Sequence, residues 1–258
     1  RHGVNGTRPD LVVWPEFALG FYLDQEPRLR AQLVWLAQEL NTALLIGAPR
    51  MVKHATGMHY YNSAYFLTPK QGLVDVYDKL RLVPFAEYRP LALPALVPHT
   101  AERPREFTPG TRSTVFPLAQ GGFGALICYE VTYPSLARRL VRNGARFLVN
   151  ISNDTWLRIG GNAALTQHFD MAIFRAVETK RFLARVATGG ISGFVDPLGR
   201  PFHLSTADEG VIIGQVFPQQ QQTVYTRFGD WFVVLCAVGV LIALLRPGRQ
   251  TARPREHS

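Results

Sequence analysis

The hydrophobic pattern in the first half of the chain alternates between short apolar runs and one amphipathic stretch. The run LVVW at 11–14 is ended by a proline and predicts a short buried strand, and LLIG at 44–47 predicts a second strand. Between them, leucines and alanines recur at helical spacing over 28–40, which predicts an amphipathic helix. YYNSAYFLTP and GLVDVYDK flank a glycine-containing turn at 70–72, so we expect a β-hairpin there.

The second half of the chain continues this alternation. TVFPL and FGALIC are expected to pair across a turn at 120–122, and helices are expected over about 133–143 and about 163–181. RFLVNIS, RFLARVAT and ISGFVDP are expected strands, and VIIGQVF is expected to be the last one. Residues 84–112 are rich in proline and show little periodicity, which predicts a long functional loop. Strands outnumber helices and hairpins mix with βαβ-like stretches, so the pattern predicts an α/β domain with mixed sheets.

The segment WFVVLCAVGVLIALL at 231–245 differs from everything before it because it is apolar on all sides. As a helix, its fifteen residues rise about 22 Å, against a hydrocarbon core of roughly 30 Å. When Phe228 and Gly229 are counted, with Asp230 near the interface, the length becomes marginally sufficient to cross the core. A tryptophan at one end and an arginine cluster at the other favour a membrane anchor, and a buried C-terminal helix is the alternative.

Composition narrows the class of protein. The chain of 258 residues is long enough for one large domain or two small ones, and 47% hydrophobic with 18% charged residues excludes a disordered protein. The net charge is +9, but four arginines lie in the last thirteen residues, and no zinc-finger spacing or RNP-like motif accompanies them. We therefore expect no nucleic-acid partner. The first residues contain no signal-peptide core, and the chain begins so close to its first strand that we expect the natural domain to start earlier.

Three polar residues follow apolar runs at predicted strand ends: Glu16, Lys79 and Cys128. Loops at strand ends converge above a rigid sheet, which is where α/β folds place their chemistry. A thiol attacks a carbonyl as the thiolate, so it needs a base such as a glutamate, and a lysine can hold the resulting oxyanion. Each residue also has an ordinary interpretation: a small buried cysteine, a lysine paired with Asp75 or Asp78, and a solvated carboxylate.

Other classes of site have no sequence support. The two cysteines show no CxxC spacing or disulfide pattern, and Cys236 lies in the apolar run, where a thiol behaves as a small hydrophobe. His168, in TQHFDMA, is expected on a helix as a packed or hydrogen-bonded side chain. No GxSxG motif and no metal-ligand spacing are present, so we expect no metal.

WPE, YDK…LVPFAEY, ALICYE and NISNDTW, in this order, resemble the nitrilase (carbon–nitrogen hydrolase) superfamily. PFAEYRP, SNDTW with a following QH, and YTRFGDWF before an apolar helix resemble its bacterial apolipoprotein N-acyltransferase branch. The resemblance implies a nitrilase-like αββα sandwich with mixed sheets over 1–224, lacking its first strand and helix. It also implies one C-terminal transmembrane helix over 225–246 and a basic cytoplasmic tail over 247–258, so the chain is expected to be an N-terminally truncated fragment.

The resemblance also assigns roles to residues. Glu16 would be the general base, Lys79 the oxyanion-stabilising cation and Cys128 the nucleophile. Three further residues would support them by orienting the lysine, positioning the amine and donating a backbone N–H: Glu87, Glu130 and Tyr129. In the proline-rich loop, apolar side chains would face acyl chains or simply pack beneath the loop: Leu91, Leu93 and Leu96.

The implied reaction takes a fatty acyl group from a phospholipid as a cysteine thioester and passes it to the N-terminal α-amine of diacylglyceryl-cysteine in an apolipoprotein. It needs no cofactor. The arginines after the apolar segment are expected to hold the tail in the cytoplasm, which would put the catalytic domain on the periplasmic side of the bacterial inner membrane. Two alternatives stay open: an amidase that hydrolyses small C–N bonds, with water resolving the thioester, and an inactive membrane-anchored copy.

Overall fold

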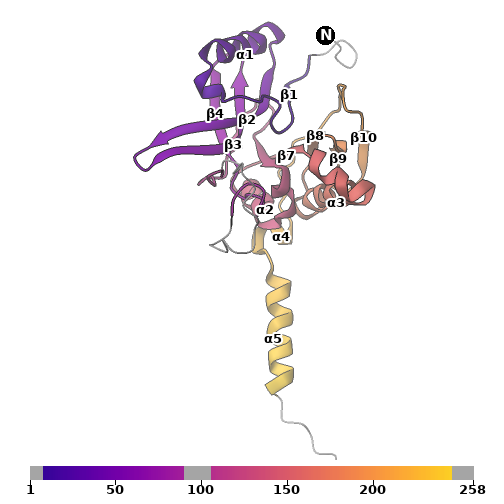
Figure 1. Cartoon of the computed structure of the whole chain (residues 1–258). Coiled ribbons are helices and arrows are strands. Elements are labelled where there is room, and N and C mark those ends of the chain that lie inside the picture. The colour runs from indigo at the N-terminus through magenta and orange to yellow at the C-terminus, as the bar shows by residue number, and fades with distance from the viewer. Residues whose placement is uncertain (1–7, 90–105, 246–258) are drawn as a thin grey trace, which may run out of the picture.

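Two β-sheets pack face to face between layers of helices in the computed structural model, which describes residues 8–89 and 106–245 (Figure 1). The first sheet has the strand order β1-β2-β3-β4, in which only the β1–β2 pair is parallel. Its strands come consecutively from the first third of the chain: β1 (Leu11–Val13), β2 (Ala43–His54), β3 (Gly57–Thr68) and β4 (Gly72–Asp78).

The second sheet has the order β10-β9-β8-β7-β6-β5. Its centre, β6 to β8, is parallel, and its margins are antiparallel. The strands are β5 (Val115–Phe116), β6 (Phe123–Ile127), β7 (Phe147–Asn153), β8 (Leu183–Thr188), β9 (Ser192–Val195) and β10 (Pro201–Ser205). Both sheets are therefore mixed, as the sequence predicts.

Three apolar clusters separate the layers. The middle cluster joins the two sheets through phenylalanine rings in tilted contact. The ring centroids of Phe66 and Phe116 are 5.1 Å apart, and those of Phe116 and Phe123 are 5.3 Å apart. The outer clusters pack α1 (Pro27–Leu40) on the first sheet, and α2 (Pro134–Arg142) with α3 (Gly161–Thr179) on the second. The arrangement is an αββα sandwich, which confirms the predicted fold class. Three short 3₁₀ helices lie between these elements: η2 (Leu23–Gln25), η3 (Cys128–Thr132) and η4 (Thr155–Gly160).

Alternation along the strands decides which side chains face which layer. On β7, Phe147, Val149 and Ile151 belong to the cluster between the sheets, whereas Leu148 belongs to the cluster beneath the helices. Because both faces of β6 and β7 are covered, these strands consist of apolar residues almost throughout, with Asn150 the buried exception before the strand end.

The structure confirms most of the predicted helices and strands, but the prediction of a last strand at VIIGQVF is wrong. VIIGQVF at 211–217 forms no strand; Pro201–Ser205 pairs with β9 instead and takes the edge of the sheet. Gly214 packs so closely on the ring of Phe194 that a side chain there would overlap it, and Val211 is 88% exposed. Residues 211–217 therefore pack against the sheet without forming the backbone hydrogen bonds of a strand.

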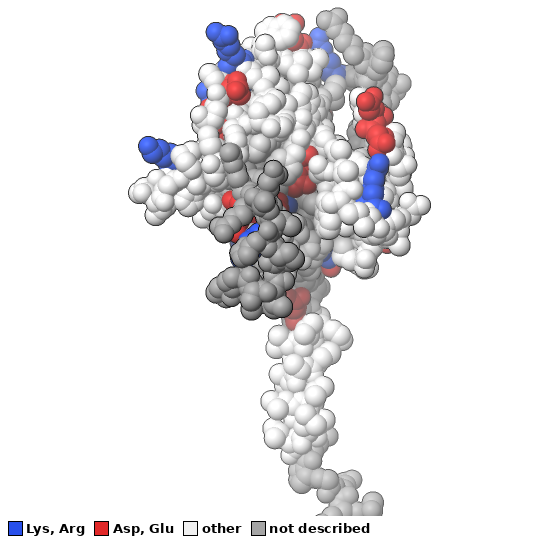
Figure 2. Space-filling view, viewed as in Figure 1, with Lys and Arg blue, Asp and Glu red and all other residues white. Residues whose placement is uncertain are grey.

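The expected membrane-crossing helix over 225–246 is not supported by the described residues. A break at Gly229, which has a φ of 67°, separates α4 (Val224–Phe228) from α5 (Trp231–Leu245) and leaves α5 with 15 residues. Within the described part of the chain, no helix has both the length and the apolar character that crossing a membrane requires. α5 extends away from the sandwich, has no buried residue, and shows no acidic or basic side chain on the face in view (Figures 1 and 2).

Hydrogen bonds fix α4 to the sandwich and so set where α5 leaves it. The Arg138 guanidinium, on α2, donates to the carbonyls of Tyr225, Thr226 and Arg227 at 2.9–3.1 Å. Thr223, which caps α4, donates to the carbonyl of Glu178 on α3 at 2.6 Å.

The predicted long loop is described only at its two ends, which contain one isolated bridge between Pro84 and Tyr88 and no helix. The expected acyl-chain contacts Leu91, Leu93 and Leu96 lie outside the described residues.

Candidate active site

Glu16, Lys79 and Cys128 lie just beyond the ends of β1, β4 and β6, so the first sheet supplies the two charged residues and the second supplies the thiol. All three are buried, at 4%, 1% and 2% exposure. Burying a carboxylate and an ammonium costs free energy unless they are paired. The burial of Glu16 and Lys79 therefore indicates a functional site and excludes the interpretation that they are solvated loop charges.

Lys79 is held between two carboxylates. Its Nζ lies 2.9 Å from Glu87 Oε1 and 3.3 Å from Glu16 Oε1. The side-chain amide of Asn62 donates to the same two oxygens, at 2.9 Å to Glu87 and 2.7 Å to Glu16. Burial alone would lower the pKa of Lys79, but Glu16, Cys128 and Glu87 outweigh it and raise that pKa. The side chain is therefore a fixed positive charge.

Glu16 also connects the two sheets. Its second oxygen accepts a hydrogen bond from the backbone N–H of Asn153, at the end of β7, at 2.7 Å. On the other side, a Cβ at Gly47 would overlap the carbonyl of Pro15, so only glycine lets the segment before Glu16 lie against β2. The carboxylate is thus fixed by backbone contacts as well as by Lys79.

Cys128 sits at a sharp turn where β6 passes into η3. Its φ of 50° is in the left-handed region, which is uncommon for a residue with a side chain. Burial and the charge of Glu16 raise the pKa of Cys128 to about 12, although Lys79 and the Ser152 hydroxyl act in the opposite direction. At neutral pH the sulfur therefore keeps its proton.

Glu130 joins the turn that carries the thiol to the strand end that carries the lysine. One oxygen accepts from the Tyr77 hydroxyl at 2.7 Å and from the backbone N–H groups of Leu80 and Arg81, at 2.6 and 3.1 Å. The other oxygen accepts from the N–H of Ile127 at 2.8 Å. Complete burial raises the pKa of Glu130 to about 7 against these four hydrogen bonds.

The remaining predicted residues lie beside the site. Glu87 contacts Lys79 directly and accepts from the N–H of Val83 at 2.7 Å, which ties the start of the long loop to the lysine. Tyr129 is half-buried, and its ring packs edge-on against Tyr133 at 5.3 Å.

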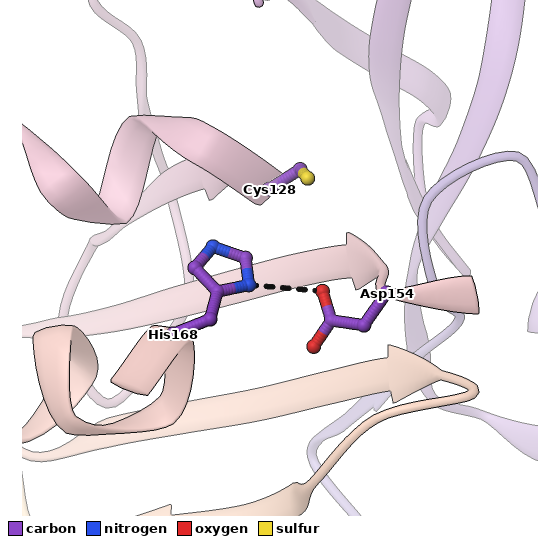
Figure 3. Close-up of side chains that lie close together, drawn as sticks. All are labelled: Cys128, Asp154 and His168. Carbon is purple, nitrogen blue, oxygen red and sulfur yellow. Dashed lines mark hydrogen bonds and ion pairs between the residues drawn. The ribbon is translucent and has the colours of Figure 1, made fainter. Parts of the chain in front are cut away.

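A buried polar network that sequence reasoning missed lies on the other side of Cys128. Asp154 lies directly after β7, is fully buried and accepts a hydrogen bond from His168 Nδ1 at 3.0 Å (Figure 3). It also accepts from the Ser152 hydroxyl at 2.6 Å and from Arg185 at 2.7 Å. Burial opposes ionisation of Asp154, but His168 and Arg185 lower its pKa to about 2. His168 was expected to be a hydrogen-bonded helical side chain, and it is one, on α3.

Atoms of Cys128, Asp154 and His168 lie within 4.8 Å of one another, a spacing that could suit a metal ion. The Arg185 guanidinium, however, lies 2.7 Å from Asp154 Oδ2 and 3.0 Å from His168 Nδ1. A fixed cation already occupies the positions that a metal would share, so these donors do not fit a metal ion.

The family profile described as carbon–nitrogen hydrolase matches residues 6–225. A protein from Geobacter metallireducens named apolipoprotein N-acyltransferase is 37% identical over 90% of this chain and 45% of its own length. A Pseudomonas aeruginosa protein of the same name is 34% identical over 96% of this chain and 48% of its own length. The chain therefore spans about half the length of the curated relatives it matches.

Among solved structures, a variant of the Nesterenkonia AN1 amidase, from the nitrilase superfamily, superposes with a TM-score of 0.62 at 20% identity, covering 91% of this chain and 85% of the amidase. At that identity the likeness establishes the fold alone. Because the family profile covers the whole sandwich together with all three strand-end residues, the chain belongs to the carbon–nitrogen hydrolase family.

Proposed function

We propose that this chain is the acyl-transferring part of an apolipoprotein N-acyltransferase. The observation that carries the proposal is the match to proteins of that name at 34–37% identity over 90–96% of this chain. The arrangement of Glu16, Lys79 and Cys128 supports it, because it supplies the base, cation and nucleophile that acyl transfer requires.

In the first half-reaction, Glu16 removes the proton from the Cys128 thiol as sulfur attacks the ester carbonyl of a phospholipid. The carbonyl oxygen becomes an oxyanion, which the Lys79 ammonium stabilises together with backbone N–H groups of the turn after Cys128. The C–O bond to glycerol then breaks, and the departing oxygen takes the proton from Glu16. A lysophospholipid leaves, and the acyl group remains on sulfur as a thioester.

In the second half-reaction, the α-amine of a diacylglyceryl-cysteine attacks the thioester. Glu16 accepts a proton from the attacking nitrogen, the C–S bond breaks, and the proton returns to sulfur. Glu87 orients Lys79 through the 2.9 Å contact, and Glu130 holds the lysine and cysteine loops together. Tyr129, next to the nucleophile, is proposed to donate its backbone N–H to the oxyanion.

Membrane association belongs to the same proposal. Both substrates carry acyl chains, and α5 exposes large apolar side chains, among them Phe232, Val233 and Leu244 at 60%, 64% and 77% exposure. An exposed apolar surface of this size marks a partner or lipid contact, and the tryptophan at its start suits a membrane interface. The arginines that follow α5 in the sequence favour a cytoplasmic tail and hence a periplasmic catalytic domain.

The test is intact-protein mass spectrometry after incubation with phospholipid vesicles. We expect a mass increase of one fatty acyl group that disappears in Cys128→Ala and persists in Cys236→Ala, which removes the other cysteine. Addition of a diacylglyceryl-cysteine peptide should discharge the adduct and yield the N-acylated peptide.

Other outcomes would reject the proposal. An adduct that persists in Cys128→Ala removes the nucleophile assignment. Ammonia release from small amides without an acyl adduct makes the chain an amidase. A folded chain that shows neither reaction is an inactive copy.

A further inference from the structure

Strand register places a serine hydroxyl beside the thiol. On the parallel strands β6 and β7, Ile127 pairs with Ile151. Cys128 follows the last residue of β6, and Ser152 is the next residue of β7, so the two lie at the same level of neighbouring strands. Neighbouring strands lie about 4.8 Å apart. The Ser152 hydroxyl is fully buried, and its presence acts to lower the pKa of Cys128.

This serine belongs to a different layer from the base. Glu16 and Lys79 come from the first sheet, whereas Ser152 lies in the network formed by β7, β8 and α3, together with Asp154 and His168. Cys128 lies between the two groups, with an Asp154 oxygen and a His168 nitrogen within 4.8 Å of its sulfur. The thiol therefore has a second set of polar neighbours that the proposed triad does not use.

The Ser152 hydroxyl has one proton and two acceptors within reach. In the structure it donates to Asp154 Oδ1 at 2.6 Å. While Cys128 is a thiol, no negative charge competes for that proton. Once the thiol is deprotonated, the sulfur becomes an acceptor of comparable charge, and rotation about the serine C–O bond redirects the hydrogen bond.

Asp154 can release the serine proton because its other donors stay in place. His168 Nδ1 remains 3.0 Å from Oδ1, and Arg185 remains 2.7 Å from Oδ2. Arg185 is itself fixed by the Asn150 side chain and by the carbonyl of Ile191 at 3.2 Å. The carboxylate thus keeps one donor on each oxygen when the hydroxyl turns away.

We propose that Ser152 is a switchable hydrogen-bond donor for the nucleophile: it donates to Asp154 while Cys128 is a thiol and to sulfur when Glu16 removes the proton. His168 is a positioning residue that acts through Ser152. Because His168 still donates a hydrogen bond to Asp154 Oδ1, the carboxylate keeps a donor on that oxygen when the serine hydroxyl turns to sulfur. One S–H bond breaks, its proton goes to Glu16, and the serine O–H stays intact. The inference rests on the proposed role of Cys128 as nucleophile.

The experiment measures the rate at which iodoacetamide alkylates Cys128 in the full chain, read from the Cys128 peptide by mass spectrometry between pH 8 and 10. We expect Ser152→Ala to slow alkylation about tenfold at each pH, the effect of raising the pKa of Cys128 by about one unit. Ser152→Thr keeps a hydroxyl and should restore the rate to within about threefold of the unsubstituted chain. The control is Ser192→Ala. The Ser192 hydroxyl is hydrogen-bonded to the backbone of Ala187, and its removal should leave the rate unchanged.

The sign of the effect separates the proposal from a structural role. Simple loosening of the site would expose sulfur and speed alkylation, whereas loss of a donor to the thiolate slows it. His168→Leu should also slow alkylation, but by no further amount in a Ser152→Ala background, because it acts through the same hydroxyl. An unchanged or faster rate in Ser152→Ala, or additive effects of the two substitutions, overturns the proposal.

Alkylation needs no acyl donor, so it is independent of the proposed function. If Ser152→Ala slows alkylation while phospholipid leaves no acyl adduct, the switch stands and the acyltransferase proposal fails. If the adduct forms while Ser152→Ala alkylates at the unsubstituted rate, the acyltransferase proposal stands and the switch is wrong.

Discussion

Replacing Arg185 with methionine is the most direct test of how the nucleophile's surroundings are held together. Its guanidinium contacts Asp154, Asn150 and the carbonyl of Ile191, and both Arg185 and Asp154 are almost completely buried, at 1% and 0% exposure. Methionine fills similar space and removes the charge. The substitution therefore leaves a buried carboxylate with hydrogen bonds but no opposite charge.

The expected loss of unfolding free energy depends on how deeply the ion pair is buried rather than on the distance between its charges. Arg185 lies 2.7 Å from Asp154, and on the surface Arg200 lies 2.6 Å from Asp196 with the arginine side chain 74% exposed. Distance alone predicts equal effects. Removing one partner of a buried pair costs about 3–5 kcal/mol of unfolding free energy, whereas an exposed pair contributes roughly 0–1 kcal/mol. We expect the two substitutions to differ by about 2–5 kcal/mol, the smallest and largest differences between these two ranges.

Urea denaturation of the detergent-solubilised chain, followed by circular dichroism, measures both substitutions under the same conditions. Arg185→Lys should fall between the unsubstituted chain and Arg185→Met, because an ammonium cannot reach three acceptors at once. Adding Asp154→Asn to Arg185→Met should recover part of the loss by removing the unpaired charge. If Arg185→Met and Arg200→Met cost the same within about 1 kcal/mol, the burial argument is wrong.

Three further outcomes follow. Lys79→Met leaves two buried carboxylates facing one amide, so acyl-enzyme formation measured by mass spectrometry should fall by about 100-fold or more, and urea midpoints should show a loss of about 3–5 kcal/mol. The pKa of Asp154 is lowered from 3.8 to about 2, which corresponds to roughly 2 kcal/mol of unfolding free energy. That contribution is present above pH 4 and lost as pH falls through 2, so Asp154→Asn should flatten unfolding free energy across this range. Arg138→Ala should release α4 and speed tryptic cleavage after Arg227, while the matched Arg142→Ala on the same helix should not; equal rates would contradict this.

The layered fold could be predicted from periodicity because the pattern of each central strand and helix reflects which faces are covered. The prediction from periodicity was wrong at the edge of the second sheet, where two segments could pair with β9. The turn decides in favour of Pro201–Ser205: Asp196 accepts from the N–H groups of Leu198 and Arg200, at 2.8 and 3.0 Å. VIIGQVF is more apolar than Pro201–Ser205, but it follows them in the chain, after the turn has already paired β10 with β9.

The strand-end residues could be located from sequence because each lies at or just past the end of a predicted strand, within motifs that resemble a known family. The Asp154 network could not. Its members come from β7, α3 and β8 with no motif spacing, and a buried arginine within a strand looks like a solvent-facing position in a hydrophobic pattern. Only the fold brings Arg185 opposite Asn150, its register partner on β7.

The charges around Cys128 explain why the thiol is protonated at rest and how it becomes reactive. One ammonium, Lys79, is shared between Glu16 and Glu87, so these three side chains already carry a net negative charge before any thiolate forms. Burial and the charge of Glu16 raise the pKa of Cys128, so the thiol is the form at rest near neutral pH.

In the proposed reaction, the proton therefore leaves the thiol during the attack, and Glu16 is the group that we expect to accept it. When Glu16 takes that proton, it loses the charge that attracted Lys79. The ammonium is then neutralised only by Glu87 and faces the new oxyanion with more of its charge available. Proton transfer and oxyanion stabilisation are thereby coupled through one 3.3 Å contact, between Lys79 and Glu16. Glu16→Gln, which preserves the shape without the charge, should for this reason eliminate acyl-enzyme formation even though Lys79 remains in place.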